Sequence, residues 1–508
     1  MTDLKLYFLV GLILVSLILI SGIKRDLGKV KTNCDFFLHG EKLHLSGLVG
    51  TLVSTNLSLG NMIFVCGILG YFYGWSGVFW VVVTIIMLGI GFQAFGRHFK
   101  PYVETKGNFG SVHDFIATSH ANADAVWQNK IRNLSVWVSG ISLFIAIILE
   151  AHLGTLFLAN AFQLPQTVFL AYFLLLVVAY TAVAGFFTVV FTDLVQFGLM
   201  FVATVAGVIL FVSMGPGTSF AEIGYETSVS SIVGGVGAPT AIGLVVLGFF
   251  WLLATPDTWQ RNCASRNIDL TKKGTTIGVA ALTVWVAVFA IGGMEVRSVV
   301  EPLIASNPDY SKGYFPFSDV FLLDFASLGS FPSLIAAAFG VGLIMAAIST
   351  IDTFLVIIAS GLNNDVMLGR ENIRNFDAIP EEGNSPLIRR GRTIIVLVGF
   401  AVFAGWFVLD AIGALGDPLS LFFVTYTIQF SLAMPVVFAC FGGTKNAKGA
   451  YYSIGVSALV TIAFGLWALV NYSSDIKIIG LGVVDLLALI PVVPVVVGGI
   501  SFALFRSN

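Results

Sequence analysis

Long, almost uncharged apolar segments constrain this chain more than any other feature. A helix that crosses a bilayer needs about 20 mostly apolar residues. Of the 508 residues, 57% are hydrophobic and 11% are charged, whereas soluble domains carry about 25% charged residues. These values exclude a soluble enzyme, a disordered chain and a nucleic-acid-binding protein, and they predict an all-α polytopic membrane protein. Thirteen segments are candidate spans: 4–23, 46–73, 76–96, 133–160, 165–184, 188–213, 235–256, 275–296, 331–362, 391–411, 417–441, 449–471 and 480–505.

The first segment, 4–23, is expected to remain in the protein as a leading span. Asp3 and Lys5 flank it and no small-residue cleavage site follows, which argues against a signal peptide. The other twelve spans are numbered 1 to 12 in chain order. A cytoplasmic segment at 111–122 is expected to form an interfacial helix. No soluble domain is evident, so residues 1–508 are predicted to form a single integral membrane domain.

The distribution of lysine and arginine predicts the orientation, because these residues are retained on the cytoplasmic side. With thirteen spans and an external N-terminus, 22 of the 26 basic residues lie in cytoplasmic segments, Arg261 among them. The four outside are Lys5, Arg297, Lys312 and Lys477. The prediction is a multi-pass protein of a plasma membrane, such as a bacterial inner membrane, with a cytoplasmic C-terminus.

Polar residues interrupt span 1. Lipid offers backbone groups no hydrogen-bonding partner, so irregular backbone at membrane depth has to line a cavity. Span 1 is therefore expected to be a buried helix that breaks between Asn56 and Gly60. The small and polar residues of this stretch are Thr51, Ser54, Thr55, Asn56, Ser58, Gly60 and Asn61.

Span 6, five spans after span 1, ends in a similar set of residues, namely Gly248, Trp251, Thr255, Pro256 and Asp257. Transporters built from inverted repeats place broken helices at corresponding positions of their two halves, with the binding site between them. The halves would be residues 46–213 and 235–441, followed by trailing helices within 449–505. The alternative is that small and polar residues only allow helices to pack closely.

Span 8 carries hydroxyl side chains and a carboxylate in mid-membrane. Spacing of i, i+3, i+4 and i+7 puts four residues on one helical face, namely Ala346, Ser349, Thr350 and Thr353. Asp352 borders that face, and an intramembrane carboxylate marks an ion or proton pathway by default. Hydroxyl, carboxylate and carbonyl oxygens are hard ligands that suit a small alkali cation. Hydrogen bonding between helices is the alternative, and it explains the hydroxyls but not the acid.

Span 5 contains a second carboxylate. Asp193 and Gln196 lie one turn apart in an otherwise apolar segment that has no lysine or arginine. A buried aspartate without a basic partner needs a bound cation, a proton or dense hydrogen bonding.

These residues resemble motifs of the sodium/solute symporter family, whose core is LeuT-type. Gly185 to Gln196 is similar to the pattern G-F-x-x-V-x-x-T-D-x-x-Q, and Ala346 to Thr353 to A-x-x-S-[ST]-x-x-[ST]. Residues 259–267 resemble the loop Q-R-x-x-A-[AS]-[KR] after span 6. The resemblance implies a 5+5 inverted repeat with one leading and two trailing helices.

The resemblance also implies a main sodium site between spans 1 and 8. Its five ligands would be the carbonyls of Ser54, Leu57 and Ala346 and the hydroxyls of Ser349 and Thr350.

A second sodium site, present in some members, would fall on Ser349, Asp193, Asp352 and Thr353. Members with that site usually carry serine or threonine where this chain has Asp352. Two carboxylates in one site either bind sodium tightly or leave one of them protonated. One or two sodium ions therefore remain open, as does proton coupling.

The solute is expected beside the break in span 1, facing spans 2, 3, 6 and 10. The polar and aromatic candidates are Asn56 and Asn61 on span 1, Trp251 on span 6 and Gln429 on span 10. Glu150 on span 3 is expected either to pair with an amine-bearing solute or to lie in water at the outer end of the span. The shortage of other polar groups disfavours a sugar, and no basic residue well inside a span could receive a carboxylate.

The predicted function is sodium-coupled secondary active symport, which imports an amino acid, an amine, a monocarboxylate or a urea-like solute by alternating access. The rival functions are a proton-coupled carrier of the same fold and a transporter-like membrane sensor. An enzyme is not expected, because the six histidines form no paired metal-binding motif and no nucleophile elbow is present. The expected partners are the solute, Na⁺ and the lipid bilayer, with no nucleic acid and no obligatory protein partner.

Overall fold

The computed structural model describes residues 2–26, 28–104, 110–122, 124–214, 225–306, 329–368, 381–416, 418–441, 446–471 and 483–505, and these are almost entirely helical. The helices up to span 5 are α1 (Thr2–Asp26), α2 (Asn33–Leu38), α3 (Leu45–Asn56), α4 (Ile68–Tyr73), α5 (Trp75–Val103), α6 (Val112–Ala121), α7 (Ala125–Phe162), α8 (Gln166–Ala184) and α9 (Phe186–Met214). The later ones are α10 (Val229–Gly234), α11 (Ala238–Ala254), α12 (Pro256–Ala264), α13 (Ile268–Ser306), α15 (Ser330–Ser360), α17 (Glu381–Ala411), α18 (Pro418–Ile428), α19 (Ala433–Cys440), α20 (Ala447–Val470), α21 (Val483–Ala488) and α22 (Val492–Leu504).

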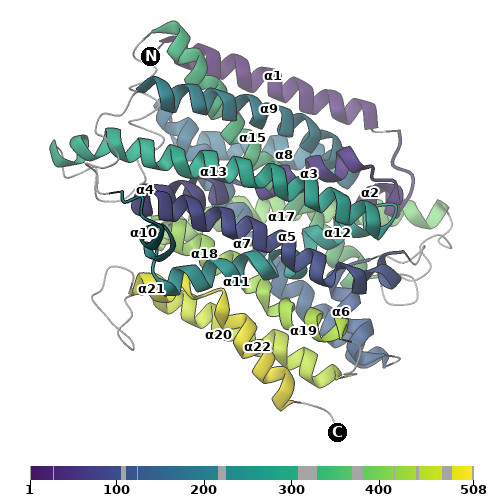
Figure 1. Ribbon diagram of the computed structural model, residues 1–508. Coiled ribbons are helices and arrows are strands. Elements are labelled where there is room, and N and C mark those ends of the chain that lie inside the picture. The colour runs from purple at the N-terminus through teal and green to yellow at the C-terminus, as the bar shows by residue number, and fades with distance from the viewer. Residues whose placement is uncertain are drawn as a thin grey trace.

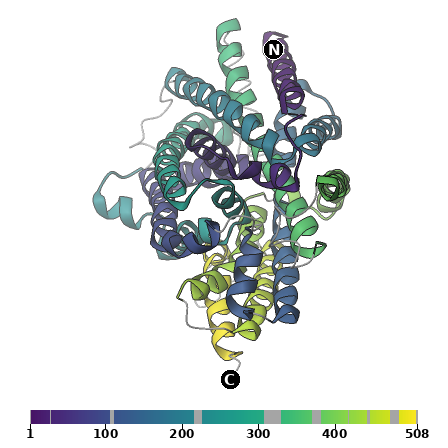
Figure 2. The ribbon, with the colours of Figure 1, turned by 90° about the vertical axis from the view of Figure 1, so that its right-hand side faces the viewer.

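The long helices run roughly side by side in one bundle (Figure 1). The short helices α2, α6 and α12 gather at one end of this bundle, whereas α4, α10 and α21 lie at the other. Viewed from the side, α1 and the pair α20 and α22 lie at opposite edges (Figure 2). The segment expected to be an interfacial helix at 111–122 forms α6.

Within the described residues, ten helices are long and apolar enough to cross a membrane, or eleven if the pair α11 and α12, bent by 44°, counts as one span. The other two expected spans, 46–73 and 480–505, contain, where they are described, only helices that are too short to cross a membrane alone. The multi-helix membrane architecture is therefore confirmed, while the count of thirteen stays a prediction.

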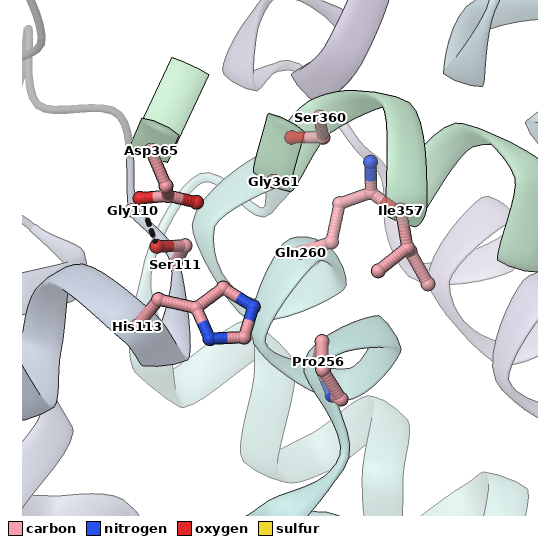
Figure 3. A pocket seen from close by; sticks show the side chains of 9 residues that line it. All are labelled: Gly110, Ser111, His113, Pro256, Gln260, Ile357, Ser360, Gly361 and Asp365. Atoms are coloured by element: carbon pink, nitrogen blue, oxygen red, sulfur yellow. Dashed lines mark hydrogen bonds between the residues drawn. The ribbon is translucent and has the colours of Figure 1, made fainter. Parts of the chain in front are cut away.

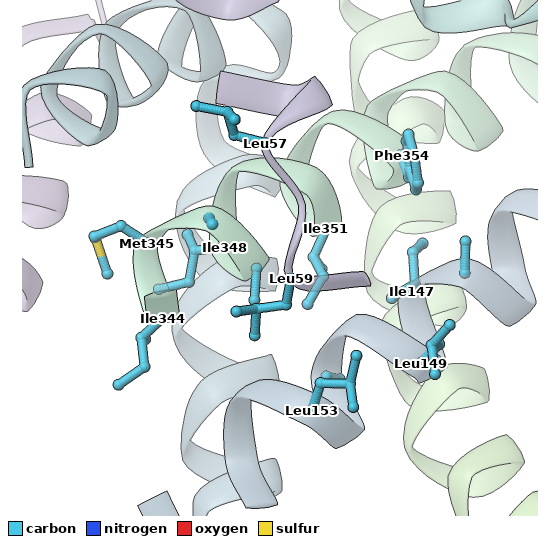
Figure 4. Close-up of a cluster of buried hydrophobic side chains, with 14 of the residues drawn as sticks. Leu57, Leu59, Ile147, Leu149, Leu153, Ile344, Met345, Ile348, Ile351 and Phe354 are labelled. Carbon is cyan, nitrogen blue, oxygen red and sulfur yellow. The ribbon is translucent and has the colours of Figure 1, made fainter. Parts of the chain in front are cut away.

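The break in span 1 lies where the polar residues predict it. Helix α3 ends at Asn56 and a π-helical segment, η2, spans Gly60–Gly67 before α4 begins. The residues of the break are not solvated, because Leu57 and Leu59 are buried in an apolar cluster with side chains of α7 and α15 (Figure 4). Irregular backbone is thus enclosed by protein rather than exposed to lipid.

Helix α15 is the central element, and it packs against α1, α3, α7 and α9. Every residue of α15 from Phe339 to Ser360 is buried. A helix that is buried on all sides has no lipid-facing stripe, so its polar side chains must find partners within the protein.

The turn between α8 and α9 brings the span 5 motif against α15. Gly185 has φ +57°, and a Cβ at this position would lie 2.3 Å from the carbonyl oxygen of Phe36. Both conditions require glycine. The turn starts α9 in the register that presents Thr192, Asp193 and Gln196 as buried side chains.

Candidate functional site

The hydroxyl of Thr350 lies between α3 and α15. It donates to the carbonyl of Ala346, one turn earlier, at 3.1 Å and contacts the carbonyl of Thr55 at 3.4 Å. Ser54, Leu57, Ala346 and Thr350 are all buried. The carbonyl that meets Thr350 is that of Thr55, which lies in the chain between Ser54 and Leu57, whose carbonyls are the expected ligands.

The end of α3 makes this region electronegative. The last carbonyls of a helix have no intrahelical donors, and the C-terminal end carries a partial negative charge of about half an elementary charge. The amide of Leu57 donates to the carbonyl of Val53 as the last helical hydrogen bond of α3. The carbonyls that follow Val53 have no donor within the helix. Helix end and hydroxyl together form an oxygen-rich position that suits a monovalent cation.

Asp193 of α9 joins the neighbouring part of α15. Its Oδ1 accepts from Ser349 Oγ at 2.5 Å, and its backbone carbonyl accepts from Ser54 Oγ at 2.9 Å. Turning the side-chain amide of Gln196 by 180° lets its nitrogen donate to the same Oδ1 at 3.2 Å. Oδ2 of Asp193 is buried and has no hydrogen-bond partner among the described residues. Asp193 therefore contacts Ser349, a residue of both predicted sodium sites.

Asp352 and Thr353 face different neighbours. Asp352 Oδ2 accepts from Tyr180 at 2.5 Å and from Thr192 at 3.3 Å, while its Oδ1 has no hydrogen-bond partner among the described residues. Thr353 Oγ1 instead lies 3.2 Å from Thr55 Oγ1, on the α3 side. Thr353 therefore shares no hydrogen-bond partner with Asp193 or Asp352 among the described residues.

A small cavity opens beside the break in span 1. Its lining residues are Thr55, Asn56, Ser58, Trp251, Thr255, Asp257, Phe354, Tyr426 and Gln429. Three residues expected to contact the solute, Asn56, Trp251 and Gln429, meet here, whereas the side chain of Asn61 lies outside the described residues.

Trp251 orders one wall of this cavity. Its indole Nε1 donates to Asn56 Oδ1 at 2.9 Å, and its ring stacks on Tyr426 with centroids 5.3 Å apart. Gln429 presents a buried side-chain oxygen that has no hydrogen-bond partner in the described part of the chain. The cavity thus combines aromatic faces with amide and hydroxyl groups.

Glu150 holds the break itself. The carboxylate accepts from the backbone amide of Leu59 at 2.9 Å and from that of Gly60 at 3.1 Å. Its side chain is fully buried, so the alternative that it lies in water at the outer end of span 3 is wrong. The carboxylate satisfies the orphan donors at the start of η2, as an anion does at a helix N-terminus.

Arg261 is buried at the core of the site, 1% exposed. Its Nη1 pairs with Asp257 at 2.9 Å, one turn earlier in α12. Its Nε bonds the hydroxyl of Thr51 at 2.9 Å and its Nη2 bonds that of Thr55 at 2.5 Å, while Thr353 Oγ1 is 3.5 Å away. The guanidinium connects α12 to both α3 and α15.

The sequence predicts Arg261 as a cytoplasmic charge, whereas the structure buries it between α3, α12 and α15. The available signal was Asp257, because an acid and a base four residues apart in one helix can pair. Without the fold, however, α12 could not be distinguished from a solvated loop after span 6.

Replacing Glu150 by glutamine is expected to lower stability by about 1.5–3 kcal/mol, the usual contribution of a hydrogen bond to a charged group. The glutamine side chain keeps one oxygen that can accept a hydrogen bond. Its NH₂ group would face the second backbone N–H, so that this donor would lose its acceptor. Unfolding in mixed micelles measures the change. Asp410→Asn is the matched control, because Asp410 is exposed near the end of α17, and equal losses in both variants would contradict the assigned role.

Replacing Arg261 by methionine is expected to cost about 3–5 kcal/mol, because it leaves the buried Asp257 carboxylate unpaired. Adding Asp257→Asn should recover a large part of the loss. A double-mutant cycle on unfolding free energies tests this. Additive effects would mean that the pair is not coupled.

Comparisons with known proteins bear on the identity of this bundle. Residues 36–456 match the model of the family described as "Sodium:solute symporter family". The sodium/pantothenate symporter of Haemophilus influenzae is 23% identical over 311 residues, which is 59% of this chain and 58% of that protein. The chain therefore matches less than two thirds of that relative's length.

Solved structures show the same fold. A Na⁺-coupled sialic acid symporter, solved in a substrate-bound outward-open state, superposes with a TM-score of 0.69 at 17% identity, covering 99% of this chain and 98% of that one. A manganese transporter of Eremococcus coleocola superposes with a TM-score of 0.54 at 13% identity, covering 92% and 96%. The family match covers most of the chain and confirms the resemblance seen in the motifs: this protein belongs to the sodium:solute symporter family.

Proposed function

We propose that the protein is a sodium-coupled secondary active symporter that imports a small organic solute by alternating access. The observation that carries the proposal is the position of the Thr350 hydroxyl against the carbonyls of Ala346 and Thr55. A sodium ion bound there would take these same oxygens, with Ser349 beside them and the carbonyls of Ser54 and Leu57 completing the set. The family membership and the Na⁺-coupled structural neighbour support sodium as the ion.

Consecutive residues of α3 supply the coupling. The carbonyl of Thr55 faces the sodium residues, whereas the next residue, Asn56, lines the solute cavity and bonds Trp251. An ion that orders this last turn of α3 also orders the solute site. Each ligand then binds more tightly in the presence of the other, as coupled transport requires.

The charges around the cavity favour a neutral or amine-bearing solute. Half-helix N-termini in such carriers receive anionic groups of the solute, but Glu150 already occupies the amides of Leu59 and Gly60. Asp257 also lines the cavity, but Arg261 neutralises it, so the wall presents no net positive charge to a carboxylate. We therefore rank amines, urea-like solutes and zwitterionic amino acids ahead of monocarboxylates, and sugars last.

The proposed topology has thirteen crossings, with the divided segments 46–73 and 480–505 as two of them, and a LeuT-type inverted repeat. Its support is that α1 and α22 run in the same direction along the bundle, which requires an odd number of crossings (Figure 1). The lysine and arginine distribution favours an external N-terminus and a cytoplasmic C-terminus.

A thermal-stability screen of the purified protein tests the function. Amines, amino acids, monocarboxylates including pantothenate, sialic acid and sugars are compared in sodium and in choline, since a ligand at a hundred times its Kd adds about 2.7 kcal/mol to stability. We expect a solute that stabilises only in sodium. Uptake of that solute into proteoliposomes, driven by a sodium gradient, then separates a carrier from a membrane sensor.

Removing the hydroxyls of Ser349 and Thr350 together by alanine substitution is expected to weaken apparent sodium affinity about tenfold or more, a loss of at least about 1.4 kcal/mol. Thr461→Ala is the control, because its buried hydroxyl donates to Ser457 in α20 at 2.7 Å, away from the site. Unchanged sodium dependence in the double variant would refute the proposed main site.

Asp352→Asn distinguishes sodium from proton coupling. A sodium carrier should change mainly its sodium affinity and keep the pH dependence of transport. A proton-coupled carrier should lose that pH dependence, because its titrating carboxyl is gone. Uptake measured across acidic and alkaline pH, with sodium present and absent, gives the answer.

A further inference from the structure

A second polar cavity lies about 15 Å from the predicted sodium residues, since Ser360 follows Thr350 by ten residues along α15 and each residue adds about 1.5 Å. It is enclosed by α6, α12, the end of α15 and the following π-helical segment η4 (Gly361–Val366) (Figure 3). Its lining residues are Gly110, Ser111, His113, Pro256, Gln260, Ile357, Ser360, Gly361 and Asp365.

Two buried oxygens of this cavity have no hydrogen-bond partner among the described residues: Asp365 Oδ2 and Gln260 Oε1. Asp365 and Gln260 are 3% and 5% exposed. The other oxygen of Asp365 accepts from Ser111 Oγ at 2.8 Å (Figure 3). Buried polar groups without partners are rare, and these oxygens are the hard ligands that an alkali cation prefers.

Two carboxyl groups lie beside one arginine at this cavity. Arg132 is fully buried and pairs with Asp114, while its Nε lies 4.0 Å from Asp365 Oδ1, so two acids share one base. Burial and the nearby Arg132 lower the pKa of His113 to about 3, so this cavity-lining histidine adds no positive charge at neutral pH. A cation in the cavity would give the Asp365 carboxyl group a second partner of opposite charge besides Arg132.

The cavity lies on the same face of α15 as the predicted sodium residue Thr350. Thr350, Thr353, Ile357 and Ser360 follow each other at three- and four-residue spacing and so share one face. Arg261 contacts this face at Thr353, and its neighbour Gln260 lines the cavity. The guanidinium therefore separates the main sodium residues from the cavity, as a barrier that a leaving cation has to pass.

We propose that Asp365, Gln260, Ser111 and Ser360 form a second, weaker sodium-binding site, at which the ion pauses after it leaves the main site past Arg261. The proposal rests on the proposed sodium coupling and topology, which put this cavity on the cytoplasmic side. It explains why a carboxylate oxygen is kept buried and unpaired at this position. A weak site suits an exit, since the ion must leave on every cycle.

Equilibrium binding of radioactive sodium to the full-length protein in detergent tests the proposal. The background variant carries Ser349→Ala and Thr350→Ala, so that the main site is removed. This variant should retain a weaker binding component. Adding Asp365→Asn should weaken that component about tenfold or more, as expected when a charged ligand is lost. Adding Asp269→Asn instead should leave it unchanged, because Asp269 is exposed in the first turn of α13.

Ser360→Ala is the second variant, because Asp365→Asn could disturb folding through Arg132. Among the described residues, the Ser360 hydroxyl accepts a hydrogen bond from Asn364 at 3.5 Å and forms none with Arg132. It should weaken the residual component by several-fold. The proposal would be overturned if the variant without the main site bound no sodium, or if neither Asp365→Asn nor Ser360→Ala weakened its remaining sodium binding. The cavity would then hold water only. Wild-type sodium binding that does not depend on Ser349 and Thr350 would instead refute the proposed main site.

Discussion

The carboxylate of Glu150, bound to two consecutive backbone amides, is the interaction on which the candidate site depends. A break inside a membrane leaves donors at one helix end and carbonyls at the other. Glu150 satisfies the donors of Leu59 and Gly60, and this leaves the carbonyl end of α3 as the unbalanced, electronegative partner. A cation is the natural complement of that end. The same contact closes the amides to an anionic solute.

Two buried side chains then connect the break to the rest of the bundle. Asp193 of α9 holds Ser349 of α15 and Ser54 of α3, and Arg261 of α12 holds Thr55 together with Asp257. Helices α9, α12 and α15 therefore all contact the last turn of α3. Separating α12 from α3 requires that the guanidinium leave its partners, so the arginine contacts are suited to a barrier between binding and release.

Composition and motifs were sufficient for the class of the protein. The apolar segments predicted the helices of a membrane bundle, and the stretches around Asp193 and Ser349 predicted a family that the comparison confirms. The polar run of span 1 also predicted the break after Asn56. These features are local in sequence, because hydropathy, helix spacing and short motifs depend on neighbouring residues.

The partners of buried charges could not be obtained in this way. From the sequence, Glu150 is either a solute ligand or a solvated carboxylate, and Arg261 is a loop charge. The actual contacts of these residues are 91 and 210 residues away in the chain. The family resemblance implies that Thr353 and Asp352 share a site, but adjacent helical residues point about 100° apart, and here they bond Thr55 and Tyr180. Sequence alone therefore determined which helices form and what family they build, since both follow from local patterns. Only the tertiary structure decided which charges neutralise one another, because in a low-dielectric interior that choice depends on distances between remote segments.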